Sequence, residues 1–263
     1  MRKRGKVLTL LYIILMYAFF YIPIIVLMVY SFNSSKSLTN FTGFSLRWYK
    51  GLLEDQEIMN AVWVSLSIAV IATVVSTVLG TLTAIGLSKT RRFLKDFVLD
   101  INNLPVMNPD IVTAIGLMIL FSSMAITRGY FTMLLSHIVF CTPYVITSVY
   151  PKVRALDPNL INAAMDLGAT PSVALRKVIV PMIKPGIYAG ILLSFSMSFD
   201  DFVISYFVTG NGVKNISIIV YHMTKRTNPT INALSTIVIL VIIIILVVVN
   251  VLKSNMNKRK NEV

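Results

Sequence analysis

Three acidic residues stand out because they occur inside long apolar stretches of the chain. Asp110 follows a proline in one stretch, and Asp200 and Asp201 lie between Phe199 and Phe202 in another. An ionised carboxylate at the bilayer centre costs about 2.5–3.5 kcal/mol on insertion scales, so such groups usually face a cavity or a transport pathway. Aromatic rings beside carboxylates suit a cation that carries methylene groups. These five residues predict a pathway for a small cation, with helix capping at Asp110 or a structural polar contact between helices as the alternative.

The other polar residues offer little for catalysis. The chain lacks the phosphate-binding pattern G-x-x-x-x-G-K-[ST], so it does not by itself hold ATP. His137 and His222 are isolated in sequence, and Cys141 is the single cysteine, which leaves no metal-binding motif and no disulfide. His137 is expected to be a hydrogen-bonded packing residue. We therefore predict a protein that is not an enzyme and has no metal or cofactor on this chain.

The composition indicates the elements that must position these residues. The chain has 263 residues, of which 56% are hydrophobic and 13% charged, and its mean hydropathy is +0.78. A soluble domain has about 45–50% apolar and about 25% charged residues, so a soluble enzyme and a disordered tail are both excluded.

Six stretches are long enough to cross a bilayer core, which needs about 20 apolar residues of helix. The third contains Pro105 and Pro109 and is expected to be kinked or broken. The fold class predicted is an all-α polytopic membrane protein with six transmembrane helices in a single domain, residues 1–263. The predicted spans are residues 7–32, 61–87, 97–126, 130–150, 186–208 and 231–252.

The net charge of +13 would suggest nucleic-acid binding in a soluble protein. With the N-terminus inside, however, 17 of the 24 Lys and Arg residues fall in inner segments and 7 in outer ones. This asymmetry follows the positive-inside rule. We therefore predict a multi-pass protein of the cytoplasmic (inner) membrane, with both termini in the cytoplasm and no nucleic-acid partner.

An outer loop over residues 33–60 contains Trp48 and Tyr49 between Arg47 and Lys50. Aromatic residues beside basic ones are typical of a segment at the level of the lipid headgroups. Trp48 is therefore interpreted either as an aromatic anchor or as part of a surface that receives a partner or lines the outer end of the pathway.

An inner loop over residues 151–185 has strong helix signals. Asp157-Pro158 predicts the start of a helix whose apolar stripe runs from Leu160 to Leu167, and Gly168 can end it. Thr170-Pro171 predicts the start of a second short helix, ended by Pro181. The small residues around Gly168 leave room for another protein surface to approach closely.

The spacing within this loop resembles the "EAA" loop of type I ABC importer permeases, which depend on a binding protein. That pattern has E-A-A, a glycine four residues later and a distal I-x-L-P, and here Asn162 replaces the usual Glu. In that family the segment is the coupling helix, which docks on a cytoplasmic ATPase. The resemblance implies ATPase coupling by Asn162, Ala163, Ala164, Asp166, Gly168, Ala169 and Pro181.

The resemblance covers nearly the whole chain and is greatest to the polyamine permeases of the family. It includes Ser31-Phe-Asn33, Phe44-x-x-x-Trp48-Tyr49, Pro109-Asp110-Ile111 and Ser198-Phe-Asp-Asp201. It implies an importer subunit that carries a polyamine such as spermidine or putrescine inward by alternating access. The implied partners are a second homologous permease, two copies of an ATPase that bind ATP and Mg, and an extracytoplasmic binding protein. An ion-coupled secondary transporter of small cations, or an ABC permease for a different substrate, is the alternative.

Overall fold

The computed structural model describes residues 2–37, 40–210, 212–224, 229–241 and 243–244. The chain divides into two compact units, Met1–Met59 with Val220–Val263 and Asn60–Ile219. Within the described residues the regular structure is helical, apart from one isolated bridge between Asn33 and Phe44.

The first unit contains α1 (Arg2–Tyr30) and α2 (Arg47–Glu54). The apolar part of α1, Thr9–Tyr30, has 22 residues and no buried residue in its most apolar window, as expected for a helix surrounded by lipid or by a partner protein. Asn33 organises the loop that follows α1. Its amide donates to the carbonyls of Ser37 and Asn40 at 2.9 and 2.8 Å, and its Oδ1 accepts from the Thr42 N–H at 2.9 Å.

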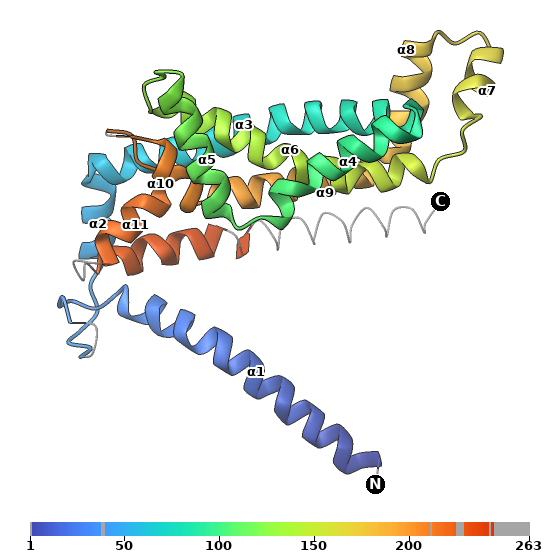
Figure 1. Cartoon of the computed structure of the whole chain (residues 1–263). Coiled ribbons are helices and arrows are strands. Elements are labelled where there is room, and N and C mark those ends of the chain that lie inside the picture. The colour runs from blue at the N-terminus through green and yellow to red at the C-terminus, as the bar shows by residue number, and fades with distance from the viewer. Residues whose placement is uncertain (1, 38–39, 211, 225–228, 242, 245–263) are drawn as a thin grey trace. The chain divides into compact units, whose positions relative to one another are not determined.

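The second unit is built around a long antiparallel pair, α6 (Tyr130–Arg154) and α9 (Val180–Asp200). In Figure 1 these helices run through the unit from the end that carries α7 and α8 to the end that carries α10. The other elements are α3 (Gln56–Lys89, which begins in the first unit), α4 (Arg92–Met107), α5 (Asp110–Ser123), α7 (Leu160–Asp166), α8 (Pro171–Ala174), the π-helical turn η1 (Leu175–Ile179), α10 (Val203–Val208) and α11 (Ile216–Thr224, which ends in the first unit).

The α6–α9 interface has a regular four-residue register. The α9 face consists of small, buried residues at every fourth position: Gly186, Gly190, Ser194 and Ser198. A Cβ at Gly186 would lie 3.2 Å from the Val149 Cα, and one at Gly190 would lie 3.3 Å from the Val145 Cα. Further along, Ser194 contacts Cys141, and Ser198 contacts His137. Small residues at this spacing let helix backbones approach closely in membranes, and here they bring His137 to the end of α9.

The predicted break in the third stretch is confirmed. Helices α4 and α5 are bent by 106° relative to each other, because Asn108 is extended and Pro109 cannot continue the hydrogen-bond ladder of α4.

The predicted count of six spans is not confirmed in full. Four described helical runs are apolar and long enough to cross a membrane, and the bent pair α4–α5 gives a fifth if it forms one span. The last predicted stretch, residues 231–252, is described only as the shorter apolar helix Thr230–Val241 and residues 243–244. Its remainder lies outside the described residues.

Two boundaries predicted in the inner loop are wrong. The first helix begins at Leu160 and not directly after Asp157, because the Asp157 carboxylate accepts the Asn159 N–H at 2.9 Å and holds a turn there. The second helix starts at Pro171 as predicted, but Pro181 does not end it. The helical run continues from Pro171 to Asp200. In η1 the Val180 N–H donates to the Leu175 carbonyl five residues earlier, and this wider turn accommodates the proline ring.

The fifth predicted span, residues 186–208, is not one helix. Helix α9 ends at Asp200, and Asp201 has extended backbone angles, φ −63° and ψ 126°. A new short helix, α10, begins at Val203. The two adjacent acids therefore occupy a helix end and a backbone break, rather than successive positions of one continuous helix.

Candidate substrate pathway and coupling surface

Asp201 is buried at the break between α9 and α10. One carboxylate oxygen accepts the Ile204 N–H at 3.1 Å, and the other accepts the Ser205 N–H at 2.8 Å. The second oxygen also lies 3.5 Å from His137 Nε2, and the two side chains are 5% and 1% exposed. A carboxylate that accepts the first N–H groups of a helix is a helix cap, and its negative charge complements the helix dipole. Asp201 thus fixes the start of α10.

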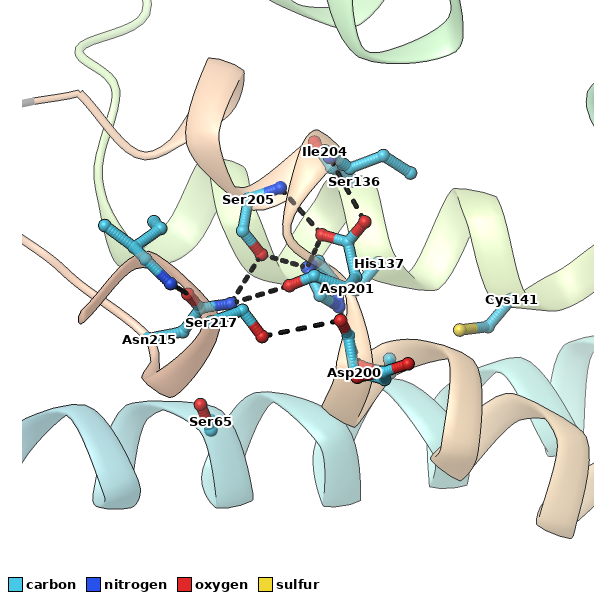
Figure 2. Close-up of polar contacts among 12 residues, drawn as sticks. Ser65, Ser136, His137, Cys141, Asp200, Asp201, Ile204, Ser205, Asn215 and Ser217 are labelled. Atoms are coloured by element: carbon cyan, nitrogen blue, oxygen red, sulfur yellow. Dashed lines mark hydrogen bonds and ion pairs between the residues drawn. The ribbon is translucent and has the colours of Figure 1, made fainter. Parts of the chain in front are cut away.

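His137 and Asn215 complete a buried polar network around Asp201 (Figure 2). His137 Nδ1 shares a 2.7 Å hydrogen bond with the Ser198 hydroxyl, and Nε2 shares one of 3.0 Å with the Ser205 hydroxyl. The Asn215 amide donates to the Asp201 carbonyl at 3.0 Å and to Ser205 Oγ at 2.9 Å. The prediction that His137 is a hydrogen-bonded packing residue is confirmed.

Asp200 has the opposite environment from its neighbour. Its side chain is exposed and makes no hydrogen bond or ion pair within the residues that the structure describes. Only its backbone carbonyl has a partner, the Ser217 hydroxyl at 3.4 Å (Figure 2). Of the adjacent pair, Asp200 is therefore the carboxylate that is available to a ligand.

Asp110 is also exposed. It is the first residue of α5, and across the described ranges its carboxylate has no hydrogen-bond or ion-pair partner. The two predicted aromatic residues are half-buried: Phe199 stacks on Phe195 with ring centroids 5.8 Å apart, and Phe202 lies 5.3 Å from Tyr206.

Trp48 belongs to the first unit, whereas the other five pathway candidates belong to the second. It is 8% exposed, its Nε1–H donates to the Asn33 carbonyl at 2.7 Å, and the Arg47 guanidinium lies 4.3 Å from its ring centroid. These contacts fix the indole to the loop that follows α1, and both interpretations of Trp48 stay predictions.

Six of the seven predicted coupling residues lie in the exposed tip of the second unit, which contains α7 and α8, and the seventh, Pro181, lies at the start of α9 (Figure 1). Gly168 has φ +84°, its N–H donates to the Met165 carbonyl at 2.9 Å, and the Ala169 N–H donates to the Ala164 carbonyl at 3.1 Å. This is a Schellman cap, which confirms the predicted helix end. The exposed members are Asn162, Ala163, Asp166, Gly168 and Pro181, and the half-buried ones are Ala164 and Ala169.

Two large apolar residues of this tip are exposed. Leu167, the last residue of the predicted apolar stripe, is 90% exposed, because α7 ends at Asp166 and the chain turns at Gly168. Met165 is also 43% exposed. The tip therefore exposes two large apolar side chains, Met165 and Leu167.

The described residues contain no group of three or more His, Cys, Asp or Glu side chains that could hold a metal ion. The exposed features of the second unit are thus the carboxylates of Asp110 and Asp200 and the apolar side chains of Met165 and Leu167.

A family model described as "Binding-protein-dependent transport system inner membrane component" matches residues 76–262. The chain belongs to this family. It is thus a membrane subunit of an importer that works with a substrate-binding protein, and the family assignment favours this class over an ion-coupled secondary transporter.

Relatives within the family cover most of the chain. The spermidine/putrescine transport system permease protein PotC of Escherichia coli K12 is 41% identical over 225 residues, 85% of each chain. The putrescine transport system permease protein PotI of the same strain is 40% identical over 236 residues, 86% of this chain and 84% of that protein. A PotC homolog of Mycoplasma genitalium is 32% identical over 95% of this chain and 92% of its own length.

Solved structures confirm the ABC permease fold. A chain from a bacterial ABC transporter involved in the import of the acidic polysaccharide alginate has a TM-score of 0.75 and 19% identity, with 96% of both chains covered. A second structure of a bacterial alginate transporter, in complex with alginate pentasaccharide-bound periplasmic protein, has a TM-score of 0.70 and 16% identity, with 94% of this chain and 93% of that chain covered.

Proposed function

We propose that this chain is the permease subunit of an ATP-driven importer that carries a polyamine inward by alternating access. The exposed carboxylates of Asp110 and Asp200, with the half-buried rings of Phe199 and Phe202 beside the latter, are the observation that carries the proposal. Ammonium groups joined by short methylene chains need anionic groups and apolar contact together. The names of PotC and PotI, at 41% and 40% identity, point to the same substrate class.

The alginate transporter shows that this fold does not decide the charge of the substrate. That protein is named for an acidic polysaccharide, and it has a TM-score of 0.75 to this chain. Two unpaired carboxylates along a pathway would repel a polyanion, since like charges at close range are destabilising. We therefore assign the substrate class from the acidic residues and the relatives, and not from the fold.

The complete importer is proposed to contain this chain, a second homologous permease, two copies of a cytoplasmic ATPase and an extracytoplasmic binding protein. ATP and Mg belong to the ATPase, and both termini of this chain lie in the cytoplasm. The exposed tip at Met165 and Leu167 is proposed to dock on the ATPase, so that closure of the ATPase dimer moves α7 and α8.

The proposed function is tested by reconstituting the complete importer in liposomes with ATP inside and the binding protein outside. We expect uptake of labelled spermidine or putrescine that requires ATP and stops when the ATPase carries a hydrolysis-inactivating substitution. Uptake by this chain alone in ATP-free vesicles would instead support an ion-coupled transporter. ATP-dependent uptake of another solute, with no polyamine uptake, would overturn the substrate class.

The coupling role is tested at Gly168. A β-branched residue at φ +84° is strained by roughly 1–2 kcal/mol, whereas asparagine tolerates this conformation. Because no atom lies within 4 Å of an added Cβ, the effect is conformational and not steric. We expect Gly168→Val to lower substrate-stimulated ATP hydrolysis by about tenfold and Gly168→Asn to leave it within about twofold. Unchanged stimulation in the valine variant, with normal membrane insertion, would refute the docking proposal.

A further inference from the structure

We infer that Asp201 is a positioning residue, which together with His137, Ser205 and Asn215 fixes the backbone break after α9 and so keeps the Asp200 carboxylate exposed to the pathway. This assignment rests on the proposed pathway role of Asp200. It goes beyond that role because it removes Asp201 from contact with substrate and gives a function to three buried residues of other elements.

The contacts of Asp201 leave no room for a cation. Its side chain is 5% exposed, and both oxygens already accept backbone N–H groups, of Ile204 at 3.1 Å and Ser205 at 2.8 Å. A substrate ammonium group would have to displace these charge-assisted hydrogen bonds and leave two buried donors without partners, which is costly. The carboxylate is committed to the protein itself.

His137 holds the break from the side of α6. One ring nitrogen bonds Ser198, before the break, at 2.7 Å, and the other bonds Ser205, after the break, at 3.0 Å. The imidazole therefore spans the interruption between α9 and α10. Its place is set by the four-residue register of the α6–α9 interface. In that register Val149, Val145, Cys141 and finally His137 of α6 contact the small residues of α9 in order.

Asn215 holds the break from the opposite side. Its amide donates to the Asp201 carbonyl at 3.0 Å and to Ser205 Oγ at 2.9 Å, while its Oδ1 accepts the Ile218 N–H at 2.9 Å. Carbonyl groups at the end of a helix lack intrahelical partners, and a buried one must find another donor. Asn215 supplies that donor to the residue that follows Asp200.

The exposure of Asp200 depends on this network because Asp200 is the last helical residue before the break. The extended ψ of 126° at Asp201 turns the chain off the helical path. Without the cap at Asp201, the two freed N–H groups favour continuation of the helix, which would place Val203 and Ile204 one turn beyond Asp200 on the same face. Loss of the network is therefore expected to change the exposure of the Asp200 carboxylate without any change in its own chemistry.

The test is the rate at which a cysteine at position 200 reacts with a positively charged, membrane-impermeant methanethiosulfonate reagent in the assembled importer. Cys141 is the sole native cysteine and is buried. The background labelling is therefore measured on the chain that lacks the Asp200→Cys substitution. We expect His137→Ala, Asn215→Ala and Asp201→Asn each to change the labelling rate at least fivefold. The double variant His137→Ala/Asn215→Ala should change it no more than the larger single effect, because both residues support one break.

Ser196→Ala is the matched control, since Ser196 is exposed on α9 and outside the network, and its labelling rate should stay within twofold. Ser205→Ala removes a single oxygen atom. It tests the network if one of the other substitutions prevents assembly of the importer. Labelling rates that stay within twofold in every network variant would overturn the inference, as would independent, multiplying effects of His137→Ala and Asn215→Ala.

Uptake kinetics separate this inference from the proposed function. Asp201→Asn is expected to lower the maximal rate of polyamine uptake more than it raises KM, whereas a substrate ligand would mainly raise KM. An increase of tenfold or more in KM for Asp201→Asn, with unchanged labelling, would make Asp201 a ligand and refute the inference. The labelling rates use no substrate, so they decide the positioning role even if the importer carries another solute.

Discussion

Gly186→Leu is expected to prevent the second unit from forming its α6–α9 interface. A Cβ at this position would lie 2.9 Å from the Ser148 carbonyl oxygen and 3.2 Å from the Val149 Cα, both of which belong to the α6 backbone. Backbone atoms do not move aside as flexible side chains do, so the helices must separate. Overpacking of a core typically costs about 1–3 kcal/mol for a few added atoms, and leucine adds four carbons at a backbone contact.

The measurement is the yield of monodisperse importer from detergent extracts and its apparent melting temperature. We expect Gly186→Leu to reduce the yield by more than tenfold, and Gly186→Ala to lower the melting temperature while some protein still assembles. Gly86→Leu is the control, because no atom lies within 4 Å of a Cβ at Gly86 in α3. Equal yields for Gly186→Leu and Gly86→Leu would show that close packing of α6 on α9 is not required.

Asp200→Asn is expected to reduce polyamine uptake by roughly 10- to 100-fold in assembled importer. A charge-assisted hydrogen bond contributes about 1.5–3 kcal/mol, and each 1.4 kcal/mol corresponds to a factor of ten. The side chain is exposed and has no hydrogen-bond or ion-pair partner among the described residues, so asparagine removes the charge without leaving a buried group unpaired.

The matched control is Asp96→Asn. Asp96 is an exposed acid of the same unit, and its carboxylate lies 3.6 Å from Arg92 in an i,i+4 pair on α4. Such surface pairs contribute little, so uptake should change by less than about twofold. If Asp200→Asn transports polyamine as well as the Asp96→Asn variant does, Asp200 is not part of the pathway.

The long apolar helices could be predicted from the sequence because length and hydropathy alone specify them. The predicted fourth span begins at residue 130, and α6 begins at Tyr130. Both predicted bounds of the fifth span, residues 186 and 208, are wrong, for different reasons. Pro181 is a strong local signal for a helix end, but the wider π-helical turn η1 accommodates the proline ring and the helix continues. At the other end the break after Asp200 depends on side chains that are distant in sequence.

The distinction between Asp200 and Asp201 could not be predicted for the same reason. The two residues are adjacent and of the same type, so they differ only in their contacts. Asp201 is contacted by His137 on α6 and by Asn215, which precedes α11. By contrast, the series Gly186, Gly190, Ser194 and Ser198 is a readable signal. Small residues at every fourth position of an apolar helix predict a close helix contact, and recognition of that series would have indicated the face of α9 that packs on α6.

The uninterrupted helical run from Pro171 to Asp200 connects the exposed tip of the unit with Asp200, so a tilt of the run would move both. It contains 30 residues, with the exposed tip of the unit adjoining one end and Asp200 at the other. At a rise of about 1.5 Å per residue it is roughly 45 Å long, so a tilt of about 10° around its middle displaces each end by roughly 4 Å in opposite directions. A displacement of that size exceeds the length of a hydrogen bond. A tilt of that size, driven from the exposed tip, would therefore be enough to withdraw the Asp200 carboxylate from a bound ammonium group.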